Sequence, residues 1–321
     1  MTTQGMKEKG WLEFKYAPTN EPIRFPVGTV HGAADGPTLA VLGGMHGSEY
    51  AGVEAAIRLF NEADPTRLRG TLMVGMIYNF PAFCHNVGFV VPQDGKNPGR
   101  TFPGKPDGTY SEVMAHLFME HFLSKANYFV ELHGGDIPEA LTPFNVYPIT
   151  GNEAVDSVSH AMAMNYNCPI VVSRKVNDPA NPPRTAFAVM ALRGTPGILC
   201  ESGQQGILKL EEVETHLVGL RNLLVHFSMT DGQIVNTVKR MFSEERAAIR
   251  SEHVGMWYPS VKLGEWVKKD QVIGVIRDYF GQDMAPVKAA FDGMVTVVRT
   301  SPPVGIGNVV LEQDRITSHE E

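Results

Sequence analysis

The segment from Gly43 to Glu49 places two metal-binding side chains three residues apart. His46 and Glu49 follow an apolar run, at a point where the pattern predicts the start of a helix. Residues three apart share one side of a helical turn, so the imidazole and the carboxylate would face the same way. Such a pair suits a divalent ion, and a catalytic zinc usually takes three protein ligands and a water. A third ligand is therefore expected from elsewhere in the chain.

His133 is the best candidate for this third ligand. It ends the apolar run 129–132, which is typical of a buried strand, and it precedes a glycine-rich loop. Ligands gather at the carboxyl ends of strands in open α/β sheets, so His46, Glu49 and His133 are expected to converge on one metal ion per chain. The alternatives are a chance His-x-x-Glu spacing and a histidine that is only hydrogen-bonded, in a chain with 11 His and 35 acidic residues.

Four motifs occur in an order that resembles one known family. They are Gly43–Glu49, Asp94–Gly104, Glu131–Gly135 and Glu201–Gly203. In this order they resemble the succinylglutamate desuccinylase/aspartoacylase family, a branch of the zinc carboxypeptidase superfamily, over nearly the whole chain. The resemblance implies a zinc-dependent deacylase with a carboxypeptidase-like mixed sheet covered by helices.

Glu201 is the candidate general base. It ends the strand-like run 197–200 and precedes a glycine-rich loop, and by resemblance the family's catalytic glutamate falls on it. Zinc can lower the pKa of bound water from about 15.7 to about 7, and a nearby carboxylate can then take the proton. A strand-end carboxylate that simply faces solvent is the alternative. Glu131 shares a strand face with His133 and would either orient that histidine or bond to backbone amides.

Arg100 is the candidate anchor for a substrate carboxylate, because a guanidinium matches a carboxylate in two parallel hydrogen bonds. It lies in the long Pro- and Gly-rich stretch 89–108. The family commonly has Asn-Arg at this point, whereas this chain has Gly99 before Arg100 and Asn97 two residues earlier. We group Asn97 with Arg100 as expected substrate-binding residues.

A second family arginine, which helps to polarise the scissile carbonyl, is expected near Gly88 and is absent there. Arg174, Arg184 or the metal itself could stabilise the oxyanion instead. The sequence does not choose between them.

The composition is that of an ordinary globular protein with 321 residues, 43% of them hydrophobic, and a net charge of −7. The chain has no basic tract, which argues against nucleic-acid binding. Its first ten residues lack the apolar core of a signal peptide, and no apolar stretch approaches the length of a membrane span. We expect a cytoplasmic protein that can form a homo-oligomer and contacts no membrane.

Cys84, Cys168 and Cys200 are an odd number of cysteines at unrelated spacings. This argues against a disulfide framework and against a cysteine-based zinc site. Cys200 precedes Glu201, and neighbouring strand residues point to opposite faces. We therefore expect Cys200 to be a small buried side chain and not a nucleophile.

Strand-like and helical patterns alternate through the first 230 residues, which predicts a catalytic α/β domain with helices on both faces of its sheet. The strand-like runs are 38–44, 71–78, 128–132, 145–149, 170–173 and 197–201. The helical patterns are 49–62, 110–125, 153–165, 184–193 and 209–227.

Residues 231–321 change to short β-type runs separated by turns, which predicts a linker and a small all-β domain of the barrel-sandwich kind. The stretch 261–274 resembles biotinyl and lipoyl domains, but it lacks the flanked lysine that carries their prosthetic group. We expect this domain to shape access to the active site.

Three functions remain in contention. The first is zinc-dependent hydrolysis of the amide bond of a small N-acyl amino acid or related N-acylated amine. The second is a metallocarboxypeptidase acting on short peptides, and the third is a non-catalytic metal-dependent binding or carrier protein. The missing carrier lysine and the presence of Glu201 count against the third function. The added domain can narrow the mouth of the cleft, and this, together with the resemblance to the deacylase branch, disfavours long peptides.

Overall fold

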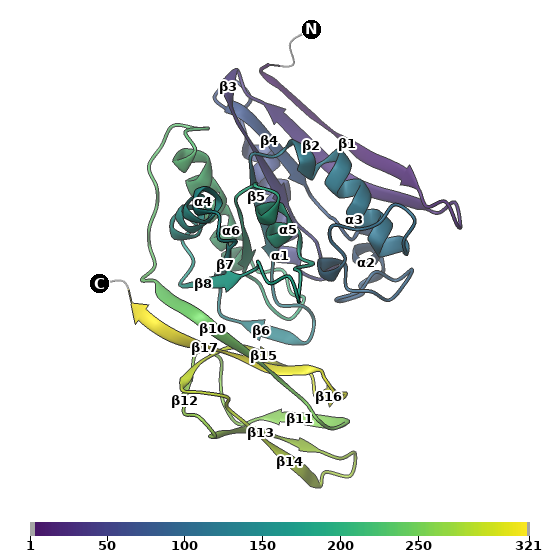
Figure 1. Cartoon of the computed structure of the whole chain (residues 1–321), viewed down its shortest axis with the longest axis vertical. Coiled ribbons are helices and arrows are strands. Elements are labelled where there is room, and N and C mark those ends of the chain that lie inside the picture. Colours follow the sequence, from purple (N-terminus) through teal and green to yellow (C-terminus); the bar gives the residue numbers. More distant parts are fainter. Residues whose placement is uncertain (1–3, 320–321) are drawn as a thin grey trace.

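A large mixed sheet runs through the molecule, with helices around its upper part and a smaller group of strands at its lower end (Figure 1). The computed structural model describes residues 4–319. Within them the large sheet has 13 strands in the order β1-β2-β4-β3-β5-β9-β7-β8-β10-β17-β15-β12, and β6 pairs with β15. The second sheet has the order β14-β13-β11-β16.

The strands of the upper part of the large sheet are β1 (Met6–Lys15), β2 (Pro22–His31), β3 (Ala34–Leu42), β4 (Arg69–Gly75), β5 (Tyr128–His133), β6 (Glu139–Leu141), β7 (Phe144–Ile149), β8 (Ile170–Lys175) and β9 (Gly197–Glu201). The helices are α1 (Tyr50–Glu62), α2 (Phe80–His85), α3 (Tyr110–His121), α4 (Glu153–Asn165), α5 (Ala186–Leu192) and α6 (Leu210–His226), with short 3₁₀ turns η1 (Pro98–Arg100) and η2 (Leu123–Lys125). Among the described residues no helix combines the length and apolarity needed to cross a membrane.

The central strands β3, β5 and β9 run parallel and side by side. Each is a nearly continuous apolar run, as expected for strands buried on both faces. Their register places Leu42 beside Glu131, and His133 beside Glu201. The strand ends that carry the candidate site residues are therefore neighbours in the sheet.

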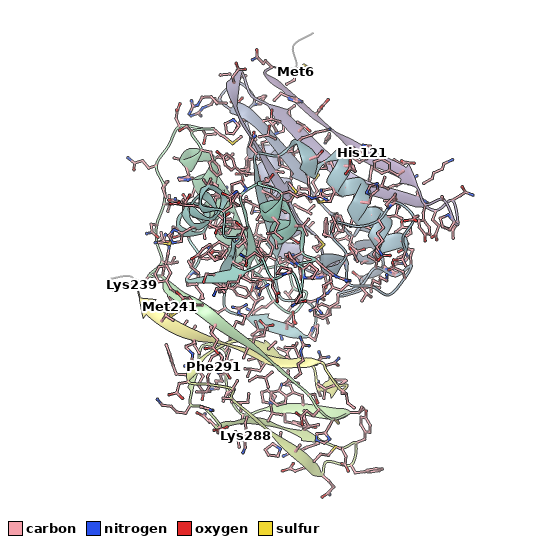
Figure 2. All side chains as sticks on the ribbon, in the orientation of Figure 1. Met6, His121, Lys239, Met241, Lys288 and Phe291 are labelled. Atoms are coloured by element: carbon pink, nitrogen blue, oxygen red, sulfur yellow. The ribbon has the colours of Figure 1, made fainter. Side chains whose placement is uncertain are left out.

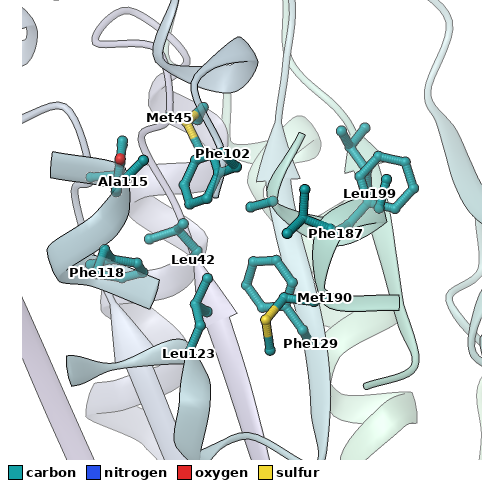
Figure 3. Packing of buried hydrophobic residues seen from close by; sticks show 14 of the residues in the cluster. Leu42, Met45, Phe102, Ala115, Phe118, Leu123, Phe129, Phe187, Met190 and Leu199 are labelled. Atoms are coloured by element: carbon teal, nitrogen blue, oxygen red, sulfur yellow. The ribbon is translucent and has the colours of Figure 1, made fainter. Parts of the chain in front are cut away.

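Side chains of these strands alternate between two hydrophobic clusters, one on each face of the sheet. One cluster packs Leu42 and Phe129 against Phe118 of α3 and Phe187 of α5, which Figure 3 shows at close range. The other cluster packs strand residues such as Cys200 against α1, α4 and α6. Helices therefore cover both faces, and the predicted mixed α/β fold is confirmed. Cys200 is fully buried, as expected.

The chain after α6 continues the same large sheet and then builds a second one. Its strands are β10 (Met241–Arg250), β11 (Gly255–Pro259), β12 (Trp266–Val267), β13 (Val272–Arg277), β14 (Asp283–Lys288), β15 (Gly293–Arg299), β16 (Pro303–Val304) and β17 (Val309–His319). β10 pairs in parallel with β8 and antiparallel with β17. Figure 2 shows Met241 at this junction, with Phe291 and Lys288 further down among the later strands.

A third hydrophobic cluster, around Trp257, Ile273 and Val310, gives these later strands a core of their own. The additional β region predicted from the sequence is therefore present, although β10 and β17 extend the large sheet instead of standing apart from it. The division of the chain at residue 230 stays a prediction.

Candidate metal centre and active-site cleft

His46 and Glu49 lie in the turn between β3 and α1. Glu49 is the residue just before the helix, with backbone angles φ −86 and ψ 68 that are not helical. The expected helical turn is therefore a tight non-helical turn, closed by a hydrogen bond from Glu49 N to His46 O of 3.4 Å. Gly47 is required there, because a Cβ atom would lie 2.5 Å from the backbone of Ala82. The turn still directs both side chains to one side.

His133 ends β5 and completes a cluster with His46 and Glu49. The three ligand atoms all lie within 4.8 Å of one another, and all three side chains are buried. His46 Nδ1 is 2.5 Å from Glu49 Oε1, and His133 Nδ1 is 3.0 Å from Glu49 Oε2. The carboxylate thus lies between the Nδ1 atoms of two imidazoles, and this donor set is one that zinc accepts.

The other nitrogen of each histidine is held by an oxygen atom. His46 Nε2 donates to Asn97 Oδ1 at 3.1 Å, and His133 Nε2 donates to Glu131 Oε1 at 3.0 Å. A proton fixed on Nε2 leaves the Nδ1 lone pair of each ring for a cation, and ligand histidines are commonly oriented in this way. The other oxygen of Glu131 accepts a hydrogen bond from Phe187 N at 2.9 Å, so Glu131 makes both of the contacts considered for it.

The charges in the cluster favour a cation between these side chains. Burial raises the pKa of Glu49, but the charges and hydrogen bonds of His46 and His133 outweigh burial and lower the pKa to about 2. The same carboxylate outweighs the effect of burial on both imidazoles and raises their pKa values. Glu49 Oε2 is buried and lies 3.0 Å from His133 Nδ1. A carboxylate oxygen in this position fits the role of a metal ligand.

Glu201 ends β9 directly beside His133 in the sheet. Burial raises the pKa of this carboxyl to about 8, and the repulsion of Glu49 adds to burial while the charge of His133 opposes it. Among the described residues its side chain makes no hydrogen bond or ion pair. A carboxylate that lies next to the His–Glu–His cluster and has no internal partner can exchange protons with a water molecule or with a substrate.

The cluster opens into a cleft of about 650 Å³, which Glu201 also lines. One wall belongs to the first part of the chain, with Phe89, Arg100 and Leu199. Another part of the lining comes from β10, β15 and the β16–β17 turn, through Arg246, Arg299 and residues 307–309. The segment after residue 230 therefore forms part of the cleft, as an access-shaping role requires.

The candidate arginines divide between two cavities. Arg100 and Arg174 line the metal cleft, and neither makes a hydrogen bond or ion pair through its side chain among the described residues. Arg184 lines a neighbouring cavity of about 450 Å³ and not the metal cleft. Of the two arginines considered as substitutes for the missing family residue, only Arg174 is in the cleft. Asn97 lines the cleft too, but its Oδ1 contacts His46 and Gly99 N.

Asp136 is a structural residue of the site that the sequence patterns did not single out. Its buried carboxylate accepts hydrogen bonds from Ser48 Oγ, from Phe89 N at 2.6 Å and from Ile137 N at 2.6 Å. It thereby joins the loop of His46, the loop after His133 and the loop where the family arginine was expected. A Cβ on Gly88 would lie 2.5 Å from Asp136 Oδ1, so a larger residue cannot occupy position 88 in this arrangement.

Phe89 occupies the cleft next to that position. Its φ is 57, and its ring lies edge-on to the His46 ring with 5.7 Å between the ring centroids. An apolar ring beside the metal ligand, where the family carries an arginine nearby, makes this wall of the cleft less polar. The signal for Asp136 was available in the sequence, as a carboxylate directly after the glycine pair that follows His133.

The protein is thus a mixed α/β protein with helices on both faces of its sheet and a His–Glu–His cluster at its strand ends. The model for the succinylglutamate desuccinylase/aspartoacylase catalytic domain matches residues 35–227. The chain belongs to this family, as its four ordered motifs predicted.

Known relatives align over most of the chain. The N-alpha-acetyl-L-2,4-diaminobutyric acid deacetylase of Halomonas elongata is 27% identical over 294 residues, which are 90% of this chain and 84% of that protein. The structure of a succinylglutamate desuccinylase/aspartoacylase from Rhodobacter sphaeroides has a TM-score of 0.85 at 23% identity, covering 97% of this chain and 96% of that one. The product-bound ectoine utilization protein EutE of Ruegeria pomeroyi has a TM-score of 0.84 at 24% identity, covering 96% and 95%. These structures support the same fold for nearly the whole chain.

Proposed function

We propose that this protein is a zinc-dependent deacylase that hydrolyses the amide bond of a small N-acyl amino acid or related N-acylated amine. The observation that carries the proposal is the convergence of His46, Glu49 and His133 within 4.8 Å, in a cleft that Glu201 also lines. Family membership and the deacetylase activity named for the Halomonas relative support amide cleavage.

Zinc fits the donor set of two imidazole nitrogens and one carboxylate, although manganese, cobalt or iron could use the same atoms. We expect one ion per chain, held by the Nδ1 atoms of His46 and His133 and the carboxylate of Glu49. When bound, zinc supplies Lewis-acid polarisation of the scissile carbonyl and makes water a stronger acid. Asn97 and Glu131 keep both imidazoles in the required orientation.

Glu201 is assigned the proton transfers. As its carboxylate takes a proton from water, the water oxygen forms a bond to the acyl carbon of the substrate. The proton then passes from Glu201 to the amide nitrogen as the C–N bond breaks, and a carboxylic acid and an amine leave. A carboxyl whose pKa lies near neutrality can serve in both directions, and burial raises the pKa of Glu201 to about 8 in the metal-free protein.

Arg100 is assigned the substrate carboxylate, because it is a guanidinium in the cleft without an internal partner. Gly99 brings the backbone of this segment close to the metal ligands, since a Cβ there would lie 3.7 Å from His46 Nε2. Arg174 is the other arginine of the cleft whose side chain has no partner among the described residues. It lies on β8, two strands beyond the strand of Glu201. We therefore assign it to the end of the substrate that lies farthest from the amide bond.

The walls contributed by β10, β15 and the β16–β17 turn favour a small substrate over a peptide, because they line the same cleft as Arg100 and add a second part of the chain to its walls. A metallocarboxypeptidase acting on short peptides is therefore the second choice. A cytoplasmic location and a homo-oligomeric state stay predictions.

The test is a substrate panel. The zinc-loaded protein is incubated with N-acetyl, N-succinyl and N-formyl amino acids and with dipeptides of the same residues, and release of the free amine is followed. Faster hydrolysis of at least one N-acyl amino acid than of every dipeptide supports the proposal. Hydrolysis of the dipeptides alone would assign the protein to the peptidases.

A further inference from the structure

The charges that line the metal cleft are mostly satisfied within the protein. Arg246 is paired with Asp314, Arg250 donates to Gly307 O, and Arg299 donates to Pro303 O. Glu131 is bonded to His133, and Glu312 lies 3.3 Å from Arg246. Four charged side chains of the cleft have no hydrogen bond or ion pair among the described residues: Arg100, Arg174, Glu139 and Glu201. Arg100, Arg174 and Glu201 have been assigned above, which leaves Glu139.

The backbone of Glu139 is fixed from three directions. Its N–H donates to Asp136 O at 2.8 Å, and its carbonyl accepts from Gln205 N at 2.7 Å. Glu139 also lies opposite Arg299 in the pairing of β6 with β15. The half-buried carboxylate therefore projects into the cleft from a rigid edge, where the catalytic part of the chain meets the later strands. A side chain on such a support is suited to reading a substrate.

The surroundings of Glu139 disfavour its negative charge. Burial raises the pKa of this carboxyl to about 8, and repulsion from Glu49, Glu312 and Asp136 acts in the same direction. The charge of His46 acts in the opposite direction. The neighbouring Arg299 is attracted by the charge of Glu139, but it uses its Nε–H on Pro303 O and makes no ion pair with Glu139. A positive charge brought by a ligand would relieve both the desolvation and the repulsion.

We propose that Glu139 binds a positively charged amine of the substrate, so that the preferred substrates are N-acylated amino acids with a second, free amino group. This inference rests on the proposed deacylase function. The carboxylate of such a substrate pairs with Arg100, its amide faces the metal cluster and Glu201, and its ammonium group pairs with Glu139. The three charges fix the orientation of the substrate in the cleft.

The test compares two N-acetyl amino acids of nearly equal shape. N-α-acetyl-2,4-diaminobutyrate carries an ammonium group, and N-acetylnorvaline has a methyl group at the same position. The unaltered protein should prefer the cationic compound. Glu139→Gln should lower kcat/KM for it by about ten- to one-hundredfold, as expected for loss of a charge-assisted hydrogen bond. The same variant should change kcat/KM for N-acetylnorvaline by less than about threefold, because this compound has no ammonium group for Glu139 to bind.

Two further variants separate recognition from structure. Glu139→Asp keeps the charge and should recover part of the preference for the cationic compound. Glu244→Gln removes a carboxylate from a different cavity, lined by β7, β8 and β10, which Glu139 does not line, and should leave the preference unchanged. Equal losses on both compounds in Glu139→Gln, or no preference in the unaltered protein, would overturn the assignment of Glu139. Hydrolysis of neither compound by a protein that cleaves other N-acyl amino acids of the substrate panel would also overturn it. Hydrolysis of no N-acyl amino acid at all would instead remove the deacylase function on which the assignment rests.

Discussion

Glu49 lies between the two histidines of the candidate metal centre, and its lowered pKa shows that this arrangement favours the negatively charged carboxylate. The carboxylate is buried, yet the neighbouring imidazoles lower its pKa to about 2. The site therefore keeps a negative charge that only a cation, either a metal ion or protons on the histidines, can balance. With a metal ion bound, His46 and His133 would serve as neutral ligands, whereas without one they would carry the compensating protons.

Replacing Glu201 with glutamine tests the proton-transfer step at this scale. An amide of similar shape cannot accept the proton of water, so turnover should fall by about 10²- to 10⁴-fold. Metal content and the free energy of unfolding should stay close to those of the unaltered protein, because the side chain has no internal partner. Steady-state kinetics, elemental analysis and urea denaturation provide the measurements. Near-normal turnover in Glu201→Gln would move the role to another carboxylate, with Glu131 the next to examine.

Replacing Arg100 with alanine tests recognition of the substrate carboxylate. Charge-assisted hydrogen bonds contribute roughly 1.5–3 kcal/mol each, so kcat/KM for an N-acyl amino acid should fall by about ten- to several-hundredfold. The primary amide of the same substrate should be affected little. Arg67→Ala, at an exposed position between α1 and β4, serves as the control. Equal losses for the acid and its amide would show that Arg100 stabilises the loop or the oxyanion.

At the scale of elements, the strand ends and helices of the catalytic part were largely predictable. The expected helix 153–165 coincides with α4, and the run 197–201 coincides with β9, because apolar periodicity and flanking glycines mark both. The convergence of His46 and His133 followed from strand ends that precede glycine-rich loops. Such local patterns predict the positions of strands well when the strands are parallel and buried on both faces of the sheet.

Other elements could not be predicted, because distant parts of the chain determine them. β1 is an edge strand rich in charged residues, and only its pairing with β2 makes it a strand. β6 has three residues and exists through its pairing with β15, about 150 residues later in the chain. The same limit explains why Glu139 was missed: nothing local to it indicates that β15 and the β16–β17 turn complete the cleft around it.

His216 on α6 supports the ends of β5 and β9, and this contact should depend on pH. Its Nε2 donates to His133 O at 3.0 Å and to Ser202 O at 3.2 Å, and its Nδ1 accepts from Tyr166 Oη. Burial lowers the pKa of His216 to about 4. The unfolded chain therefore binds a proton more readily, so the contribution is complete above pH about 6.5 and is lost as the pH falls towards 4.

Urea denaturation of the zinc-loaded protein at several pH values measures this effect. Relative to the unaltered protein, His216→Gln should lose less stability between pH 7 and pH 4, by roughly 3 kcal/mol at most, because glutamine can donate and accept without titrating. His85→Gln, at an exposed position, should follow the unaltered protein. Parallel curves for His216→Gln and the unaltered protein would contradict the assignment of this pH dependence to His216.

At the scale of the whole molecule, a buried ion pair joins the later strands to the cleft. Asp314 on β17 is fully buried and accepts from Arg246 at 2.7 Å, from Ser243 Oγ at 2.8 Å and from Thr296 Oγ1 at 2.6 Å. The Arg246 guanidinium lies over the Phe144 ring at 3.7 Å, and Phe144 pairs with Glu201 in the sheet. The position of the later strands is thus connected to the wall of the cleft.

Asp314→Ala should destabilise the protein by about 3–5 kcal/mol, because it removes the buried partner of Arg246 and leaves this buried guanidinium with only Glu312, at 3.3 Å. Asp283→Ala removes an exposed partner of Arg277 and should cost about 1 kcal/mol or less. Urea denaturation measures both. Similar small losses in the two variants would mean that solvent reaches Arg246 and that the later strands are held mainly by their apolar contacts.

The central claim is that one metal ion, bound by His46, Glu49 and His133, makes this protein a deacylase. The most direct measurement is a zinc titration of chelator-treated protein during hydrolysis of an N-acetyl amino acid found active in the substrate panel. We predict that activity rises from near zero to a plateau at one zinc per chain, and that a variant with both histidines replaced by alanine neither binds zinc stoichiometrically nor gains activity. Full turnover by the metal-free protein, or stoichiometric zinc binding by the double variant, would contradict the claim.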